Sequence, residues 1–373
     1  MRILIVASLP RSLCNFRGAL IEAFCAAGHE VHCAAPDLLE DGATRDWLRA
    51  RDVTCHDLPL ARTGLSVAGD LRTLVHLYWV MRRIAPDLML AYTIKPVIWG
   101  TIAAWLARVP QRVALITGLG YVFVGAARGK RALIRQIASR FYTVALRRAT
   151  LVFFQNPDDR DDFMRWGILS SDKETVLVNG SGVDTNIFTP APFPNVTPRF
   201  LLIARLLGDK GIREYAAAAA RLKAHWPNAE FHLVGPLDLN PEAITESEVR
   251  GWQEAGHIIW HGEQDDVRSA ISQAHVFVLP SYREGIPRSV LEAMSMGRPI
   301  ITTDAPGCRE TVQDGINGFL VPVRNADALG RAMEKYLSDP TIIQPMGAQS
   351  RRIAEQKYDV HNVNAVMLEA IGL

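Results

Sequence analysis

Short apolar runs rich in Val, Ile and Leu alternate with longer stretches of helical periodicity along the chain. In the first half, six such runs are predicted to be β-strands: residues 2–8, 30–35, 53–58, 87–92, 112–117 and 150–155. The stretches predicted to be helices between them are residues 16–28, 66–85 and 129–148. Continuous apolar strands that alternate with helices are typical of a parallel sheet covered by helices on both faces.

The same alternation restarts after a loop with four prolines at residues 186–200. The strands predicted in the second half are residues 199–205, 229–235, 257–262, 275–281, 299–304 and 318–322, with a long helix at 212–226. We therefore predict an α/β chain of two Rossmann-like domains that meet near residues 180–198. Neither half carries a GxGxxG after its first strand or a GxxxxGK(S/T) loop, so the sequence lacks an NAD fingerprint and a phosphate loop.

The bulk composition is that of a soluble globular protein. The chain has 373 residues, 49% of them hydrophobic, and a net charge of +2, which is long enough for two domains with a core each. Its five cysteines are odd in number and lack CxxC spacing, so we expect reduced thiols in a cytosolic protein and no zinc site. The apolar start at residues 2–10 is too short for a signal-peptide core, and no uncharged apolar run reaches the ~18–20 residues that cross a bilayer.

The charges are distributed unevenly along the chain. Residues 1–180 hold 23 basic and 16 acidic residues, a net charge of +7, which leaves −5 for the remainder. No acidic residue lies between Asp87 and Asp158, whereas ten Lys or Arg residues do. The first half is therefore expected to meet an anionic partner.

The basic helix predicted at 129–148 carries much of this charge. Its apolar stripe consists of Leu133, Ile137, Phe141, Val144 and Ala145, flanked by arginines. We expect an anionic bilayer or lipid diphosphate to attract it, at roughly 1 kcal/mol per Lys or Arg, and the candidate lipid contacts are Arg128, Lys130, Arg131 and Arg135. The alternative is a core-packed helix with a solvated basic face. Nucleic acid is not expected, because the sequence has no stacking platform or RNA-binding signature.

Polar residues follow several predicted strands of the second half: Arg205, Gly235, Ser281–Glu284 and Asp304–Gly307. Because ligands bind beyond the carboxyl ends of parallel strands, these residues predict a site along one sheet edge. Arg205 and Lys210 lie in a strand-to-helix turn and suit a diphosphate, the arginine by bidentate bonding and the lysine as a point charge. Taken alone, the two cations would equally fit an ordinary surface pair.

The stretch SYREGIPRSVLEAM at 281–294 places Glu284 and Glu292 eight positions apart. In one continuous helix they would lie ~80° apart around the axis and ~12 Å along it, too far to share a small ligand. Pro287 instead fits the first turn of a helix. Glu284 would then lie in the preceding loop and Glu292 in the second turn, with both facing one crevice.

These residues suit a sugar nucleotide. Arg205 and Lys210 would neutralise a diphosphate leaving group, helped by the amides near Gly285 and Ile286. Glu292 would accept hydrogen bonds from ribose hydroxyls, and Glu284 would hold hydroxyls of the transferred sugar. The alternative for the two carboxylates is that Glu284 caps the following helix and Glu292 is solvated.

The pattern of Glu-x7-Glu at 284–292, preceded by R-x4-K at 205–210, resembles the retaining glycosyltransferases of family four. The resemblance extends through nearly the whole chain and includes VFFQNPDD, SGVDTNIFTP and the closing YDVHNVNAVMLEAIGL. The segments NFRGAL, ITGLG and EGIPRSVLEA are most similar to the bacterial branch that extends polyprenyl-diphosphate-linked sugars.

The resemblance implies the GT-B fold, in which two Rossmann-like domains with parallel sheets face each other across a cleft. It implies domains at 1–180 and 181–357 and a final helix at 358–373 that crosses back to the first domain. It also implies retention of anomeric configuration, no metal and no cofactor, and donor binding mainly by the second domain, Gly235 included. The residues it marks as catalytic are Glu284, Lys210 and Arg205.

The facing wall would bind the acceptor through residues of the first domain: Asn15, Arg17, Lys95, Thr117, Gly118 and Gly120. The alternative for the two glycines is that they only shape a turn. Many family members place a histidine in the loop after the fifth strand, where this chain reads ITGLG. No residue of this chain is therefore an obvious candidate for the role of that histidine.

We expect a peripheral enzyme on the cytoplasmic face of the cell membrane. Its partners would be a UDP-sugar, with an N-acetylhexosamine as the sugar, a lipid-linked acceptor and the anionic membrane surface, in surface-glycan assembly. Three alternatives remain: a GDP-mannose-dependent transferase of the same fold, a UDP-sugar epimerase, and a non-catalytic nucleotide-binding scaffold. An epimerase would act without an acceptor, and a scaffold would bind nucleotide without turnover.

Overall fold

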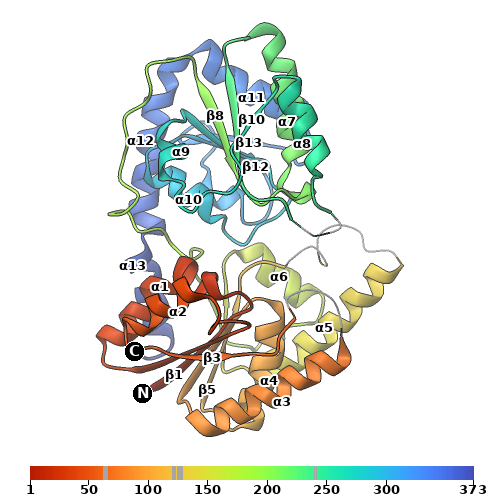
Figure 1. Cartoon of the computed structure of the whole chain (residues 1–373), viewed down its shortest axis with the longest axis vertical. Helices are drawn as coiled ribbons and strands as arrows, with labels where there is room; N and C mark the ends of the chain where they lie inside the picture. Colours follow the sequence, from red (N-terminus) through yellow and green to blue (C-terminus); the bar gives the residue numbers. More distant parts are fainter. Residues whose placement is uncertain (62–65, 120–122, 124–128, 239, 241) are drawn as a thin grey trace. The chain divides into compact units, whose positions relative to one another are not determined.

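The computed structural model describes residues 1–61, 66–119, 123, 129–238, 240 and 242–373 (Figure 1). The chain forms two compact units. Unit 1 consists of Met1–Ser181 together with Val363–Leu373, and unit 2 of Gly182–Asn362. Unit 2 is thus inserted between two pieces of unit 1.

The described part of unit 1 contains a parallel sheet with the strand order β3-β2-β1-β4-β5-β6-β7. Its strands are β1 (Arg2–Val6), β2 (Glu30–Ala35), β3 (Thr54–Asp57), β4 (Leu88–Tyr92), β5 (Gln111–Ile116), β6 (Leu151–Phe154) and β7 (Thr175–Leu177). The first six match the predicted strands, which confirms the doubly covered sheet that the apolar runs indicated.

Helices cover both faces of this sheet. They are α1 (Pro10–Ala26), α2 (Gly42–Arg49), α3 (Val67–Ile84), the π-helical turn η1 (Pro96–Gly100), α4 (Thr101–Leu106), α5 (Lys130–Arg148), α6 (Pro157–Arg165) and α13 (Val360–Ala370). Side chains of β1 alternate between two cores, with Ile3 and Ile5 in one and Leu4 and Val6 in the other. Such alternation follows from the two-residue period of a strand.

The helix predicted at 16–28 begins at Pro10, six residues earlier than expected. Proline fits the first position of a helix because its missing N–H has no intrahelical partner there. The prediction also missed α2, α6 and β7. Asn156 caps α6 by accepting a hydrogen bond from the amide of Asp159 at 2.8 Å, the arrangement expected of an N-cap.

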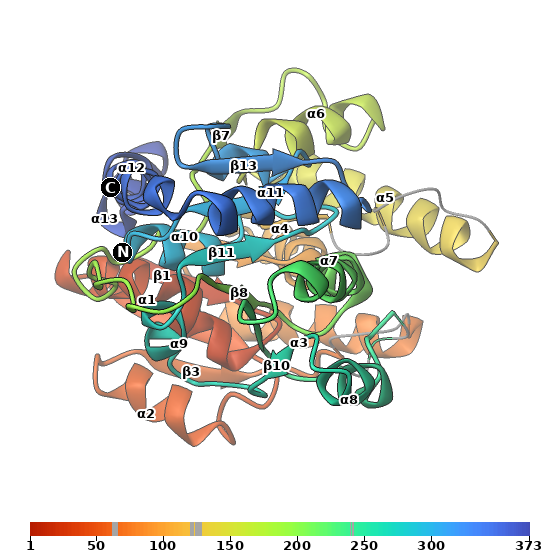
Figure 2. The ribbon, with the colours of Figure 1, turned by 90° about the horizontal axis from the view of Figure 1, so that it is seen from above.

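Unit 2 is a second parallel sheet, with the order β10-β9-β8-β11-β12-β13 in its described part. Its strands are β8 (Arg199–Ile203), β9 (Glu230–Val234), β10 (Ile259–Trp260), β11 (Val276–Leu279), β12 (Ile300–Thr303) and β13 (Gly318–Val321). Its helices are η2 (Gly208–Lys210), α7 (Ile212–His225), α8 (Glu246–Glu254), α9 (Arg268–Ser272), α10 (Arg288–Ser295), η3 (Arg309–Thr311), α11 (Ala326–Ser338), η4 (Pro340–Ile342), α12 (Ile343–Ile353) and η5 (Ala354–Tyr358). Helix α11 packs against α7 and β13 (Figure 2).

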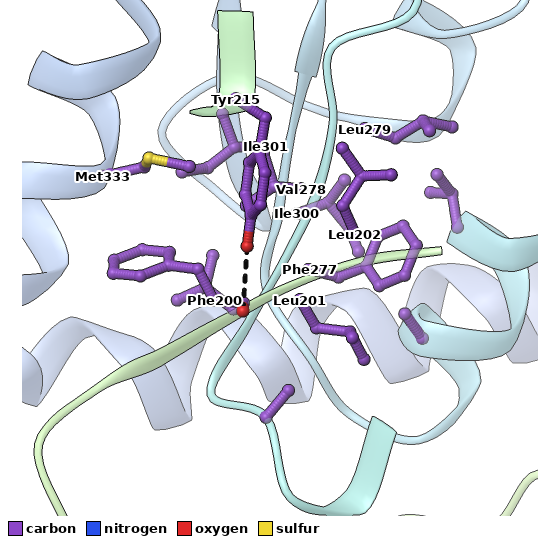
Figure 3. Packing of buried hydrophobic residues seen from close by; sticks show 14 of the residues in the cluster. Phe200, Leu201, Leu202, Tyr215, Phe277, Val278, Leu279, Ile300, Ile301 and Met333 are labelled. Atoms are coloured by element: carbon purple, nitrogen blue, oxygen red, sulfur yellow. Dashed lines mark hydrogen bonds between the residues drawn. The ribbon is translucent and has the colours of Figure 1, made fainter. Parts of the chain in front are cut away.

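The core of unit 2 fixes α7 to the sheet (Figure 3). Phe200, Phe277 and Tyr215 are fully buried, and the Tyr215 hydroxyl lies 3.0 Å from the carbonyl oxygens of both Phe200 and His232. A buried tyrosine that donates to a strand carbonyl holds its helix in one position. The turn that precedes α7, with Lys210, is thereby fixed relative to β8.

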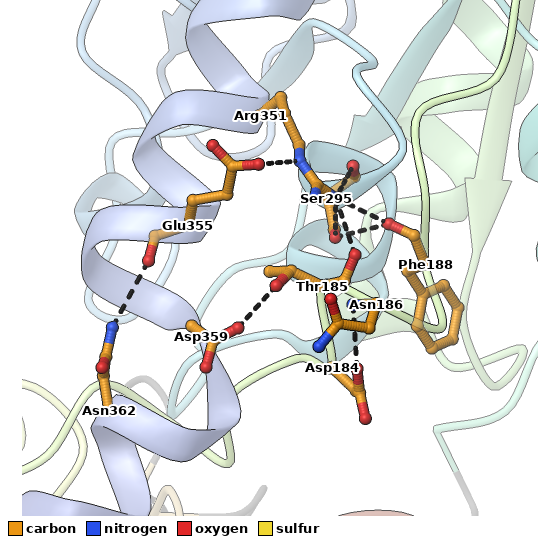
Figure 4. Close-up of polar contacts among 9 residues, drawn as sticks. All are labelled: Asp184, Thr185, Asn186, Phe188, Ser295, Arg351, Glu355, Asp359 and Asn362. Atoms are coloured by element: carbon orange, nitrogen blue, oxygen red, sulfur yellow. Dashed lines mark hydrogen bonds and ion pairs between the residues drawn. The ribbon is translucent and has the colours of Figure 1, made fainter.

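The two segments through which the chain passes between the units are hydrogen-bonded to each other. The Val183 amide donates to the Tyr358 carbonyl at 2.8 Å, and the Val360 amide donates to the Val183 carbonyl at 3.0 Å. Nearby, Arg351 Nη1 donates to the carbonyls of Thr185, Phe188 and Ser295, and Thr185 Oγ1 donates to Asp359 Oδ2 at 2.6 Å (Figure 4). Among the described residues, no helix has both the length and the apolar character that a bilayer crossing requires.

Candidate functional site

The predicted site residues of unit 2 all follow strands of its sheet. Arg205 and Lys210 come after β8, Gly235 after β9, and the segment 281–284 after β11. The strands β8, β11 and β12 are neighbours and run parallel. Their carboxyl ends therefore lie at one edge of the sheet, as the sequence predicted.

Lys210 and Glu284 form an ion pair at this edge. Lys210 Nζ lies 2.5 Å from Glu284 Oε1, and each side chain is only 16% exposed. The Ser281 hydroxyl donates to the same carboxylate oxygen at 2.8 Å. Burial alone would lower the pKa of Lys210, but the carboxylates of Glu284 and Asp209 outweigh it and raise that pKa. Lys210 therefore stays charged.

Backbone contacts hold the loops that carry this pair. The Tyr282 amide donates to the Asp209 carbonyl at 2.8 Å, and the Glu284 amide donates to the Pro306 carbonyl at 3.0 Å. Gly307 has φ +77°, and a Cβ there would lie 2.2 Å from the Glu284 carbonyl oxygen. Only glycine fits this backbone and this approach, so the loop after β12 lies directly against the loop with Glu284.

Arg205 is the more open of the two cations. Its side chain is 47% exposed, and Nη1 lies 2.8 Å from Asp238 Oδ2. Its positive charge lowers the pKa of Lys210, which opposes the rise that Glu284 and Asp209 cause. Asp238, in the turn after β9, was not among the predicted residues, although Gly235 at the end of the predicted strand 229–235 was. The sequence could not show which carboxylate the flexible Arg205 reaches.

Glu292 lies in the second turn of α10, as predicted. Its carboxylate accepts a hydrogen bond from Arg288 Nε at 2.8 Å. Burial raises the pKa of Glu292, and Arg288 opposes that change. The Ser289 hydroxyl donates to the Ile203 carbonyl at 3.0 Å, which fastens α10 to the end of β8. Glu284 and Glu292 thus belong to two different ion pairs on two neighbouring segments.

The loop between these glutamates contains a backbone donor. The Ile286 side chain is buried in the core of unit 2, and among the described residues its amide N–H has no hydrogen-bond acceptor. An amide without an acceptor next to cationic side chains suits an anionic ligand. The donor role expected for the amides near Gly285 and Ile286 stays a prediction.

A second polar cluster adjoins the Lys210–Glu284 pair and was not predicted. The Tyr282 hydroxyl donates to Glu214 Oε1 at 2.7 Å, and the Arg324 guanidinium lies 4.6 Å from the Tyr282 ring centre. Burial, followed by the bond to Glu214, raises the pKa of Tyr282 to about 12. Asp209 Oδ1 and Glu214 Oε2 are buried without a hydrogen-bond partner in the described residues.

Of the acceptor residues expected in unit 1, Asn15 and Arg17 lie on α1, and Lys95 lies directly before η1. Asn15 is exposed on α1, whereas Arg17 is buried and its guanidinium lies 5.3 Å from the Tyr92 ring centre. Lys95 forms a largely buried ion pair with Asp70 of α3, with Nζ and Oδ1 2.9 Å apart. Lys95 is therefore held by a carboxylate within unit 1.

Thr117 and Gly118 follow β5 directly. Gly118 has φ +120°, a conformation that favours glycine, so its role in shaping the turn has direct support. Gly120 lies outside the described residues.

The predicted lipid contacts of α5 are only partly described. Arg128 lies outside the described residues, as do the side chains of Lys130 and Arg131. Arg135 turns inward, with its guanidinium 4.4 Å from the Trp166 ring centre. The expected apolar stripe is also divided, because Ala145 is buried whereas Leu133, Phe141 and Val144 are exposed. The core side of α5 is instead built by Tyr142, Ala145 and Leu146.

Two family models match the chain. The model "Glycosyl transferase 4-like" matches residues 2–156, and "Glycosyl transferases group 1" matches residues 197–339. Each therefore falls within one of the two units.

The chain is similar in sequence to bacterial transferases. It is 28% identical over 352 residues to the N,N'-diacetylbacillosaminyl-diphospho-undecaprenol alpha-1,3-N-acetylgalactosaminyltransferase of Campylobacter jejuni, covering 91% of this chain and 90% of that one. It is 24% identical over 320 residues to the UDP-Gal:alpha-D-GlcNAc-diphosphoundecaprenol alpha-1,3-galactosyltransferase of Escherichia coli, covering 81% and 79%. Among solved structures, HepE of Anabaena in complex with UDP matches with a TM-score of 0.78 at 20% identity, covering 100% and 99% of the two chains. This last likeness shows the GT-B fold.

Proposed function

This chain belongs to the group 1 glycosyl transferases of GT-B fold, and we propose that it transfers an N-acetylhexosamine from UDP to a saccharide carried on a polyprenyl diphosphate. The names of two relatives support the acceptor, since both describe transfer to a diphospho-undecaprenol-linked sugar. One of them transfers N-acetylgalactosamine and the other takes UDP-galactose as donor. The proposed process is the assembly of a surface glycan on the cytoplasmic side of the cell membrane.

The observation that carries the proposal is the Lys210–Glu284 ion pair at the end of β8 and β11. A partly buried lysine beside Arg205 provides positive charge for a diphosphate, and the adjoining carboxylate provides an acceptor for sugar hydroxyls. The two members of this pair would thus bind the two parts of a nucleotide sugar, the lysine its diphosphate and the carboxylate its sugar. We propose that the diphosphate replaces Glu284 as the ion-pair partner of Lys210, and that Glu284 then accepts hydrogen bonds from the sugar.

The proposed reaction needs no acid from the protein at the leaving group. The bond between the sugar C1 and the diphosphate oxygen breaks, and its electron pair leaves with UDP. The acceptor hydroxyl forms the new bond to C1 on the same face, which retains the configuration, and its proton is released. Lys210, Arg205 and the Ile286 amide stabilise the charge that develops on the diphosphate.

Glu292 is the proposed ribose ligand. Its carboxylate is held by Arg288, which leaves oxygen lone pairs for two hydroxyls of the ribose. Because burial raises the pKa of Glu292, hydrogen bonds from the ribose would stabilise the charged carboxylate.

The test is transfer by the purified protein from UDP-GlcNAc, UDP-GalNAc, UDP-Gal and GDP-mannose to a short-chain polyprenyl-diphosphate-linked sugar, with the product identified by mass. We expect turnover with an N-acetylated UDP-sugar, and a loss of turnover in Glu284→Gln. Glu246→Gln, whose carboxylate pairs with Arg250 on an exposed helix face, is the matched control and should keep full activity. Turnover with GDP-mannose alone would refute the donor assignment, and nucleotide binding without any transfer would refute the enzymatic one.

A further inference from the structure

We propose that the outer faces of α3, α4 and α5 together form one surface of unit 1 that docks onto an anionic lipid bilayer. The proposal rests on the proposed function, because a polyprenyl-linked acceptor lies in a membrane. Helix α4 contacts both α3 and α5, and all three cover the same face of the unit-1 sheet (Figure 1). Their outward sides therefore form a continuous layer.

Helix α3 has a second apolar side that the core does not use. Leu71, Val75 and Trp79 follow each other at intervals of four and are all exposed, Trp79 to 64%. Residues spaced by four lie on one side of a helix. The opposite side, with Leu77 and Met81, already fills the core of unit 1. A stripe of large apolar side chains that faces water is unusual in a protein surface and marks an interaction site.

Helix α5 repeats this arrangement. Leu133, Phe141 and Val144 are exposed, whereas Tyr142 and Leu146 are buried in the core. At 100° per residue, the three exposed residues lie within about 80° of one another around the helix axis. Three residues of the apolar stripe predicted from the sequence thus face outward, whereas Ala145 faces the core.

Helix α4 connects the two stripes. Trp105 and Leu106 at its end are exposed, and the Arg148 guanidinium of α5 lies 4.1 Å from the Trp105 ring centre. The Phe141 ring of α5 lies 4.9 Å from the ring of Trp99 in η1. Tryptophans and arginines in this mixture are typical of the interface between lipid headgroups and acyl chains.

The charge of the surface has one sign. Among the side chains that the structure describes, its exposed charged residues are Arg72, Arg82, Arg83, Arg140, Arg147 and Arg148. The carboxylate in these three helices is that of Asp70, which is buried and paired with Lys95. Such a face complements anionic headgroups. It opposes pairing with a second copy, because the arginines of the two copies would face each other.

The experiment compares two valines on helices that cover opposite faces of the unit-1 sheet. Val144 on α5 is 50% exposed and Val366 on α13 is 43% exposed. Val144→Glu and Val366→Glu therefore make the same chemical change at similar exposure, and Trp79→Glu adds a second position on the proposed surface. Binding is measured by flotation with vesicles that contain phosphatidylglycerol and with vesicles of phosphatidylcholine alone. Thermal unfolding checks that each variant is folded.

We expect the wild-type chain to float with the phosphatidylglycerol vesicles and to bind the phosphatidylcholine vesicles at least tenfold more weakly. Val144→Glu and Trp79→Glu should each lose at least tenfold in binding to the anionic vesicles, whereas Val366→Glu should match the wild type. Equal loss in all three variants, or none in any, would overturn the proposal. So would self-association that Val144→Glu abolishes in place of vesicle binding.

Transfer assays separate this proposal from the proposed function. Val144→Glu should keep transfer to a short-chain, water-soluble acceptor and lose transfer to a long-chain acceptor in vesicles. If the wild type binds vesicles but transfers to neither acceptor, the proposed function fails and the docking surface stands. If Val144→Glu transfers to both acceptors as the wild type does, the docking surface fails and the proposed function stands.

Discussion

Replacing Glu284 by glutamine removes one charge of the pair with Lys210 and keeps the size of the side chain. In the wild type Lys210 Nζ lies 2.5 Å from Glu284 Oε1, and both side chains are 16% exposed. Removing one partner of a fully buried pair costs about 3–5 kcal/mol. Because this pair keeps some exposure and Asp209 remains beside Lys210, we expect a loss of ~2–3 kcal/mol in the free energy of unfolding of unit 2.

The same variant should bind UDP at least as tightly as the wild type does. In the wild type Glu284 competes with the diphosphate for Lys210. In Glu284→Gln this competition is gone, and the diphosphate supplies the negative charge that Glu284 no longer places beside Lys210. Relief of about 1.4 kcal/mol would make the dissociation constant of UDP tenfold smaller. Transfer should nevertheless fall at least ~100-fold, or ~2.7 kcal/mol in activation free energy, because the sugar loses its carboxylate acceptor.

Titration calorimetry with UDP and initial rates of transfer test these two effects together, with Glu246→Gln as control. Lys210→Met provides the opposite case and should weaken UDP binding. If Glu284→Gln weakened UDP binding by the same factor as Lys210→Met, Glu284 would contribute to nucleotide binding itself, and the exchange of partners at Lys210 would be refuted.

Three further changes test other parts of the structure. Glu292→Gln should weaken UDP binding about tenfold by calorimetry and flatten the pH dependence of thermal stability. Burial raises the pKa of Glu292, so its ionisation costs stability as the pH rises through that pKa. An unchanged pH profile would contradict this. Arg298→Leu should cost ~3 kcal/mol or more in denaturant unfolding, because the buried guanidinium donates to the carbonyls of Ala191, Pro192, Ile271 and Ser272; a loss below 1 kcal/mol would contradict it. His56→Gln should reduce the acid sensitivity of unit 1, since burial and the nearby His32 lower the pKa of His56 to about 4. Wild-type stability is therefore lost as the pH falls from ~6.5 through that value. Circular dichroism from pH 7 to pH 4 measures this loss, and an equal loss in both proteins would contradict the prediction.

The sheets could be predicted from the sequence because a buried parallel strand is a continuous apolar run. Twelve of the strands coincide with such runs, whereas the short edge strand β7 (Thr175–Leu177) does not. The helix α6 has the sequence PDDRDDFMR and buries little beyond Phe163, so it shows no apolar period. Its N-cap Asn156 and the following Pro157 were the signals that could have found it.

The place of the site followed from topology, but the pairing of its side chains did not. Parallel strands bring their carboxyl ends to one edge wherever they lie in the sequence, and this predicted the positions of Arg205, Lys210 and Glu284. Long side chains reach partners from other loops, as Arg205 reaches Asp238. Whether Arg135 turns to solvent or to Trp166 is decided by packing that one helix pattern does not contain.

The insertion of unit 2 into unit 1 affects the order in which the protein is completed on the ribosome. Met367 of α13 and Ile371 directly after that helix belong to the core of unit 1, and the Gln111 side chain donates to the Ile371 carbonyl at 3.4 Å. All of unit 2 is therefore translated before the last apolar side chains of unit 1 emerge. Part of one core of unit 1 therefore stays exposed to water until the last helix is made, some 180 residues later. Chaperones would meet unit 1 in that interval.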